Sequence, residues 1–139
     1  MPKLPRLLAE RTPESEKITI NLGYVDLGRI DLLVQEGFYA NRSDLIRTAI
    51  RNQLEGHAGV VAQSLSRQTL ELGLRDYDRA YLERVRAAGE VVDIKVVGLA
   101  RIASDVPPDL ARATIRTVSV LGALQASTEV KDALSGRIL

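Results

Sequence analysis

The stretch that decides the fold is Lys17–Leu54, KITINLGYVDLGRIDLLVQEGFYANRSDLIRTAIRNQL. Its first six residues alternate polar and apolar side chains, which predicts a half-buried β-strand with Ile18, Ile20 and Leu22 on one face. Such a strand is too short to be stable alone, and helical patterns rather than a second strand follow it. We therefore expect it to pair with the same strand of a second copy, forming a symmetric, two-stranded antiparallel ribbon.

The first helical pattern runs from about Val25 or Asp26 to Glu36. Its apolar residues recur at the three- and four-residue spacing of an amphipathic helix. Gly37 stands where a left-handed residue would end the helix.

The second helix is expected to begin at Asn41 or Ser43, since either side chain can cap a helix N-terminus. Its apolar spacing continues to about Arg67, but Gly56 and Gly59 lie on the way. A glycine costs up to ~1 kcal/mol in a helix interior, so a continuous helix and a kink or break are both open. The predicted dimer core of ribbon and helices comprises Ile18, Ile20, Leu22, Ile30, Leu33, Leu45, Ile46 and Ile50.

Three phrases of this stretch resemble a known family. They are KITINL at Lys17–Leu22, LGRIDLLV at Leu27–Val34 and NRSDLIRTAIR at Asn41–Arg51. Together they look like the ribbon-helix-helix DNA-binding proteins of the CopG/MetJ/Arc type, over about 40 of the 139 residues. The resemblance implies an intertwined homodimer that reads double-stranded operator DNA through the major groove, usually as a repressor, in the cytoplasm at the nucleoid.

The same resemblance implies that the outward strand residues touch base edges. Here they are Lys17, Thr19 and Asn21. Their chemistry suits base recognition, because lysine donates to guanine, asparagine reads adenine, and threonine offers a hydroxyl and a methyl. The alternative is a solvated strand face.

The turn Asn41, Arg42 and Ser43 lies at a helix N-terminus, where free backbone N–H groups favour a phosphate. Arg42 would add a charge-assisted contact. Capping alone is the alternative role for this turn. Arg47 and Arg51 are expected instead to form surface or dimer-interface pairs with Asp44 or Glu55.

Composition limits the class of protein. The chain has 139 residues, 45% of them apolar, which is typical of one globular domain or two small ones. No apolar run reaches the roughly 18 residues of a membrane span, and Met1–Glu16 lacks the apolar core of a secretory signal. The absence of cysteine excludes disulfides, cysteine-ligated zinc and thiol catalysis. We expect no membrane partner and no cofactor.

Charge argues for modest DNA affinity. The net charge is +1, and Lys17–His57 holds five basic and five acidic residues. A duplex-binding protein usually carries a strongly basic surface. Dimerisation doubles Lys17 and Arg42 on one surface, so adjacent dimers acting together would compensate.

Metal and catalytic sites are not expected. His57 is the single histidine, and residues 58–139 contain no histidine or cysteine that could ligate nickel as in the metal-responsive members of the superfamily. Asp78 and Tyr81 fall near one another at helical spacing, but no nucleophile, base and orienting group come together. We therefore do not expect an enzyme.

The C-terminal half repeats itself at an offset of 24 residues. Each unit consists of a strand pattern (TLELGL, VDIKVVGL, TVSVLGAL) followed by a short helix, which predicts a small parallel sheet with helices on one face. The alignment places these sets together: Leu70, Ile94, Val118; Leu72, Val96, Val120; Leu74, Gly98, Gly122; and Leu82, Val106, Val130. An ordinary α/β effector domain is the competing interpretation.

Helix caps mark the three repeats. Asp78, Ser104 or Asp105, and Ser127 are candidate caps, and Pro107-Pro108 fits a helix start.

The sequence thus predicts an α+β protein in four parts. These are an arm at 1–14, a ribbon-helix-helix domain at 15–57, a connecting helix or linker at 58–69, and an assembly or effector domain at 70–139. The rival functions are an antitoxin whose C-terminal part holds a toxin, and a structural protein that polymerises through its C-terminal domain.

Overall fold

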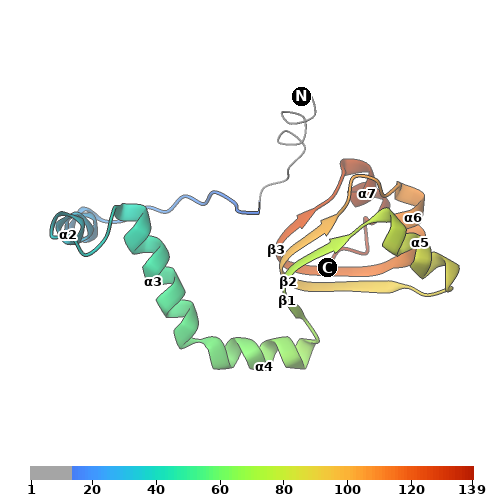
Figure 1. Ribbon diagram of the computed structural model, residues 1–139, viewed down its shortest axis with the longest axis horizontal. Helices are drawn as coiled ribbons and strands as arrows, with labels where there is room; N and C mark the ends of the chain where they lie inside the picture. Colours follow the sequence, from blue (N-terminus) through green and yellow to red (C-terminus); the bar gives the residue numbers. More distant parts are fainter. Residues whose placement is uncertain (1–13) are drawn as a thin grey trace. The chain divides into compact units, whose positions relative to one another are not determined.

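The computed structural model describes residues 14–139, which divide into two units. One unit is Ser15–Ser64 and the other contains Leu65–Leu139, together with Glu14. Each is described by itself (Figure 1). The predicted arm, apart from Glu14, lies outside the described residues.

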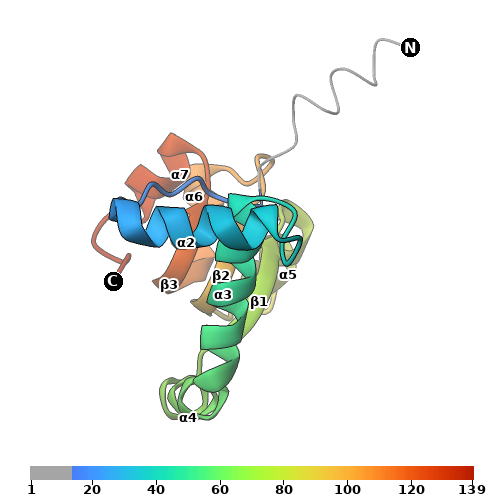
Figure 2. The ribbon, with the colours of Figure 1, turned by 90° about the vertical axis from the view of Figure 1, so that its left-hand side faces the viewer.

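The first unit contains the two predicted helices. They are α2 (Tyr24–Gln35) and α3 (Arg42–Gly56), which Figure 2 shows crossing one another. Gly37 ends α2 in the predicted left-handed conformation, with a φ of 88°. The Gly37 N–H donates to Val34 O at 3.1 Å and the Phe38 N–H to Leu33 O at 3.0 Å, which is the hydrogen-bond pattern of a Schellman motif.

Beyond α3 the helix breaks. His57 follows the last residue of α3, and α4 (Ala58–Gln68) starts immediately after it. Of the two possibilities that the glycines left open, the break at Gly56 is the one observed.

The N-terminal segment of this unit has no regular structure in the single chain. Residues 15–23 form neither helix nor strand, and Ile18 and Ile20 are 71% and 57% exposed. The strand predicted at Lys17–Leu22 stays a prediction, because its expected partner is a second copy.

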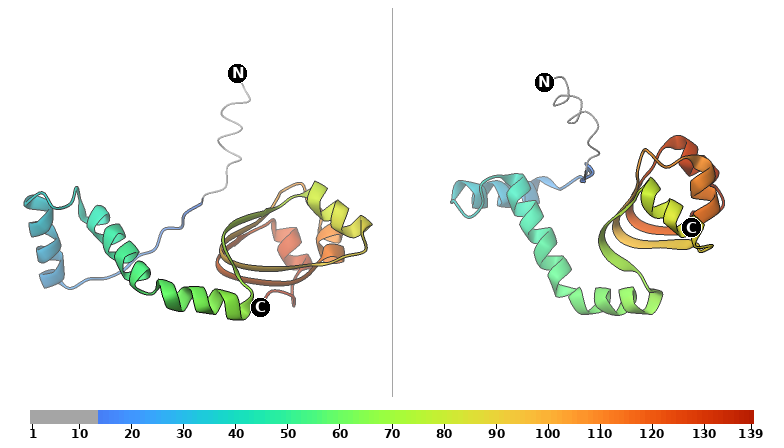
Figure 3. Two further views of the ribbon diagram at one scale, coloured as in Figure 1. Left: turned by 60° about the horizontal axis from the view of Figure 1, so that its bottom comes forward. Right: turned by 45° about the vertical axis from the view of Figure 1, so that its right-hand side comes forward.

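The second unit is a three-stranded parallel sheet of order β1-β2-β3 with a helix after each strand. In chain order the elements are β1 (Glu71–Tyr77), α5 (Arg79–Ala87), β2 (Val92–Ile102), α6 (Pro108–Thr114), β3 (Ile115–Gln125) and α7 (Thr128–Ala133). Figure 3 shows the strands bending together, with the three helices gathered on one side. The predicted strand–helix repeats and the parallel sheet are confirmed.

The register corrects the predicted alignment by one residue. Between β2 and β3 paired residues lie 24 apart, as in Gly98↔Gly122, but between β1 and β2 they lie 25 apart, as in Gly73↔Gly98. The first strand–helix repeat therefore holds one residue more than the second repeat. The predicted alignments of Leu72 with Val96 and of Leu74 with Gly98 are therefore wrong, because Glu71 pairs with Val96 and Gly73 with Gly98.

This glycine row makes the bend. Gly73, Gly98 and Gly122 have φ values of 131°, 138° and 119°, in a region that other residues rarely adopt. A Cβ atom at Gly98 would overlap the Gly73 carbonyl oxygen, and one at Gly122 would overlap the Gly98 carbonyl oxygen. Neighbouring strands can therefore pair through the bend only with glycine at positions 98 and 122.

The core of this unit lies between the bent sheet and the helices. Leu82, Val106 and Val130, which the repeat aligned, are all buried. The rest of the core cluster is Tyr77, Ile94, Val96, Ala100, Ile102, Leu110, Ala111, Ile115, Val118 and Leu134.

Two of the predicted helix caps are confirmed and one is wrong. Asp78 Oδ1 accepts a hydrogen bond from the Tyr81 N–H at 2.8 Å, and Ser127 Oγ accepts one from the Val130 N–H at 3.1 Å. The residue that caps α6 is Pro107, without a side-chain hydrogen bond, rather than Ser104 or Asp105. Asp105 instead accepts from the Arg79 N–H, at 3.2 Å, at the start of α5.

The two edges of the sheet differ. At the β3 edge the Val118 N–H donates to Arg137 O at 2.9 Å, and the Leu139 N–H donates to Val118 O at 2.8 Å. The C-terminal residues thus cover part of β3. β1 forms the other edge and pairs only with β2 within the described part of the chain.

Candidate nucleic-acid interface

The polar residues predicted to read bases are all exposed. Lys17, Thr19 and Asn21 alternate with Ile18 and Ile20 in the segment before α2. The strand on which they would share one face is not formed in the single chain, so their role in base reading stays a prediction.

The turn before α3 is held by reciprocal capping. The Asn41 side chain accepts from the Asp44 N–H at 2.8 Å, and Asp44 Oδ2 accepts from the Ala40 N–H at 2.9 Å. The capping role that the sequence predicted for Asn41 is confirmed. Its side-chain oxygen is thereby used, and the exposed Ser43 follows it in the first turn of the helix.

Arg42 makes an ion pair that the sequence did not reveal. Its Nε donates to Asp31 Oδ1 and its Nη2 to Asp31 Oδ2, both at 2.8 Å, which ties α3 to α2. The hydrogen bond from Arg42 lowers the pKa of the Asp31 carboxyl, and the same bond raises the pKa of the guanidinium.

The ion pair uses one edge of the guanidinium. The Nη1 group and the second Nη2 hydrogen point along the other edge, because an arginine fork carries five donors in a fixed plane. A phosphate can therefore approach Arg42 while Asp31 fixes its orientation. The partners are 11 positions apart in the sequence, beyond the three- or four-residue spacing of neighbours on one helix, so no local pattern signals this contact.

Two further cations on α3 stand apart from acidic groups. The sequence led us to expect Arg47 and Arg51 to pair with Asp44 or Glu55, but no salt bridge joins them anywhere in residues 14–139. Neither arginine thus forms the expected pair within one chain, and a pair across the dimer interface stays a prediction. Both arginines are exposed and lie one helical turn apart, so sequence spacing alone could have singled them out as a cationic pair.

The predicted dimer core is uncovered in the single chain. No residue of Ser15–Ser64 is buried. Leu22, Leu33 and Ile50 are 37%, 38% and 46% exposed, while Ile30, Leu45 and Ile46 are half-buried. An apolar surface shared by two helices and the preceding segment needs cover from another surface.

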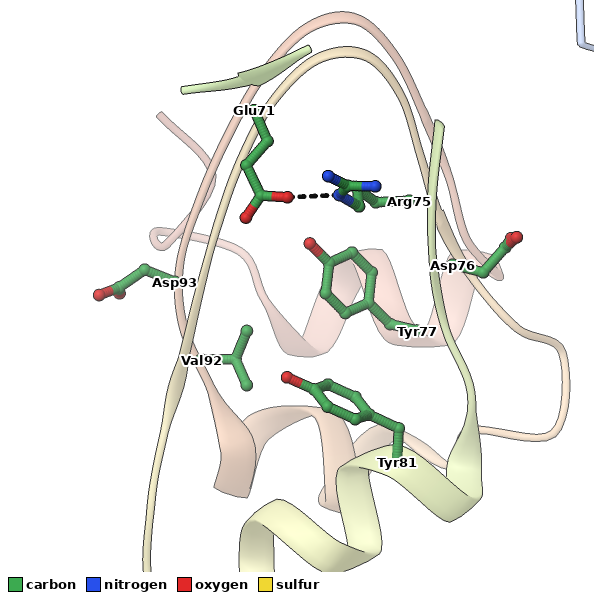
Figure 4. Close-up of a pocket in the computed structure, with 7 residues that line it drawn as sticks. All are labelled: Glu71, Arg75, Asp76, Tyr77, Tyr81, Val92 and Asp93. Carbon is green, nitrogen blue, oxygen red and sulfur yellow. Dashed lines mark hydrogen bonds and ion pairs between the residues drawn. The ribbon is translucent and has the colours of Figure 1, made fainter. Parts of the chain in front are cut away.

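The second unit has a hollow of about 260 Å³ at the β1 end of its core. In Figure 4 the Glu71 and Arg75 side chains point toward one another above the Tyr77 ring, and they form an ion pair across the bend of β1. Tyr77 and Tyr81 lie with their ring centroids 6.1 Å apart, and burial raises the pKa of Tyr77. The remaining lining residues are Asp76, Val92 and Asp93.

Other kinds of site find little support in the described part of the chain. Residues 14–139 contain no group of three or more His, Cys, Asp or Glu residues placed to hold a metal ion. His57 lies 3.2 Å from Gln53 through its Nε2 atom. Over the same residues, no helix combines the length and the apolar character that crossing a bilayer requires.

Comparison with known proteins gives one match. A family model described as "Ribbon-Helix-Helix transcriptional regulator family" matches residues 13–131. Neither the search of curated proteins nor the search of solved structures gave a match. The family match extends through the second unit as far as α7.

Proposed function

Since this chain belongs to the ribbon-helix-helix transcriptional regulator family, we propose that it is a homodimeric, sequence-specific DNA-binding repressor. The observation that carries the proposal is the first unit, in which the family's helices are formed while the apolar residues expected in a dimer core lie uncovered. A second copy supplies both the cover for these residues and the missing strand.

The ribbon follows from dimerisation. Lys17–Leu22 of each copy pair antiparallel, with Ile18, Ile20 and Leu22 directed onto the helices. A two-stranded ribbon fits the major groove of B-DNA. Lys17, Thr19 and Asn21 then lie on the outer face of the ribbon and read base edges.

Phosphate contacts come from α3. Its N-terminal N–H groups, Ser43 and the free edge of Arg42 face one phosphate on each half-site. The ion pair with Asp31 holds the guanidinium in place before DNA arrives, which reduces the entropy that Arg42 loses on binding. Because phosphate contacts carry no sequence information, they set affinity and position while the ribbon sets specificity.

The test combines selection with a matched pair of variants. Selection of bound duplexes from a random pool gives the preferred site and the half-site spacing. Asn21→Ala is expected to cost about 1–3 kcal/mol on that site and little on random duplex. Asn52→Ala, the same change at an exposed position on α3, is the control and should leave both affinities unchanged.

Two outcomes would contradict the proposal. Random pools that yield no enriched sequence would exclude sequence-specific binding. An equal loss on selected and random duplexes for Asn21→Ala would exclude base reading by this strand face.

A further inference from the structure

Among residues 14–139, the edge of the second unit that no further strand or segment pairs with is β1. At the opposite edge, β3 exchanges backbone hydrogen bonds with Arg137 and Leu139. An uncovered strand edge presents unpaired N–H and C=O groups that can accept another strand. β1 is suited to accept a second copy of itself because of the sequence of its residues 71–75.

Residues 71–75 read Glu-Leu-Gly-Leu-Arg, and this order is self-complementary about Gly73. If two copies of β1 run antiparallel with Gly73 opposite Gly73, Glu71 faces the partner's Arg75 and Arg75 faces the partner's Glu71. Leu72 likewise faces the partner's Leu74. Opposite charges and matched apolar side chains across a strand pair are both stabilising.

The side chains also point to the correct faces for this pairing. Glu71 and Arg75 are in register with Val96 and Ala100, which are buried, so both charges lie on the inner face of the sheet. Leu72 and Leu74 lie on the outer face and are 63% and 37% exposed. Each inward residue thus meets an inward residue, and each outward residue meets an outward one.

The bend is compatible with the same arrangement. A two-fold axis between the two Gly73 residues, perpendicular to the local strand direction, carries the glycine row of one copy into that of the other. No side chain obstructs this approach, because no atom lies within 4 Å of the Cβ position at Gly73. The sheet can therefore continue through both copies without a change in curvature.

We propose that a second copy of this chain docks on β1, forming an antiparallel β1–β1 pair centred on Gly73. The ion pair of Glu71 and Arg75 then becomes a cluster of four alternating charges, and the hollow beside Tyr77 is closed by the partner. Each chain thereby has one interface in the ribbon-helix-helix unit and another at β1. The second interface does not depend on DNA binding.

Charge reversal in the full-length chain tests the pairing. Arg75→Glu places four negative charges at the seam, and Glu71→Arg places four positive charges there. In either variant the assembly mass measured by analytical ultracentrifugation should fall at least two-fold from that of the unaltered protein. An equimolar mixture of the two variants, in which the charges alternate again, should return to the original mass.

The mixture is decisive because each variant has also lost its own Glu71–Arg75 ion pair. Mixing cannot restore a contact within one chain, so recovery of mass reports the contact between chains. The double variant Glu71→Arg with Arg75→Glu keeps an ion pair within the chain and should assemble like the unaltered protein. Circular dichroism of each variant checks that the sheet and helices persist.

The register has its own test, since the chain contains no cysteine. Leu72→Cys mixed with Leu74→Cys should give a disulfide-linked dimer under oxidation, while either protein alone should give much less. Single variants that keep the full mass, a mixture no heavier than its components, or equal cross-linking in all three samples would each overturn the proposal.

Discussion

Replacing Gly98 by alanine should test the glycine row directly. At a φ of 138° a non-glycine residue costs about 1–3 kcal/mol. The new Cβ would also overlap the Gly73 carbonyl oxygen, which is backbone and cannot rotate away. Forcing a methyl group into a packed site typically costs a further ~1–3 kcal/mol. We therefore expect Gly98→Ala to destabilise the second unit by about 2–6 kcal/mol in total.

Gly73→Ala is the matched control. Its φ of 131° gives the same conformational cost, but no atom within 4 Å opposes the added Cβ. The effect of a Gly-to-Ala change on the unfolded chain is common to both variants. The difference between the two free energies of unfolding therefore isolates the overlap, at about 1–3 kcal/mol.

Urea unfolding measures this difference. In a Tyr24→Phe, Tyr39→Phe background, tyrosine fluorescence comes from Tyr77 and Tyr81 alone, so it reports the second unit. Both variants are measured in an Arg75→Glu background, in which the β1 pair is not expected to form, because Gly73 lies at the centre of that pair and association would add to the apparent stability. Equal losses for Gly98→Ala and Gly73→Ala would refute the steric account of the row.

Three further changes test other parts of the molecule. Ile20→Asp should abolish the ribbon-helix-helix dimer, because each buried charge costs several kcal/mol. In an Arg75→Glu background, which removes the β1 pair, sedimentation should then show monomer. A dimer that persists would place Ile20 on the outer face of the ribbon. Arg42→Ala should weaken binding to selected and random duplexes alike and reduce the log–log salt slope by about 1.8, at 0.9 for each of two phosphates per dimer; an unchanged slope argues against the contact. Hydrogen bonding from Arg116 lowers the pKa of Asp93 from 3.8 to about 2. The stabilising contribution of the Asp93 carboxylate is therefore complete above pH 3.8 and is lost as pH falls toward 2. On acidification from above pH 3.8 to 2, the urea midpoint of Asp93→Asn should fall less than that of the unaltered chain.

Local chemistry made much of the fold predictable. The terminator Gly37 and the caps Asp78 and Ser127 act through hydrogen bonds within a few residues, so the sequence places them directly. The sequence does not decide between a continuous helix and a break at Gly56. The free-energy cost of one glycine inside a helix, up to ~1 kcal/mol, is too small to settle it. The register of β1 is shifted by one residue from the predicted alignment, because the segment from Gly73 to Gly98 is one residue longer than that from Gly98 to Gly122 and the apolar pattern of the strands does not reveal the difference.

Contacts between distant segments were not predictable. Arg42 meets Asp31 only because α2 and α3 pack together, and nothing near either residue indicates the other. Asp105 looked like a cap for the helix that follows it, yet it binds the start of α5 from the neighbouring repeat. For the interface itself, the residue types of the ribbon were visible in the sequence, whereas their alignment depends on a second chain.

Val118 exchanges backbone hydrogen bonds with the C-terminal residues Arg137 and Leu139. These bonds affect how the sheet could be extended by strands of other copies. A unit that stacks strand on strand could extend without limit if both of its edges accepted a neighbour, as fibrils do. Because the chain's own C-terminal residues bridge β3 at Val118, that part of the edge cannot accept a neighbouring strand, and addition through this sheet favours the β1 edge. The chain's own C-terminal residues thus guard one edge of the sheet, while the other edge stays available for recognition.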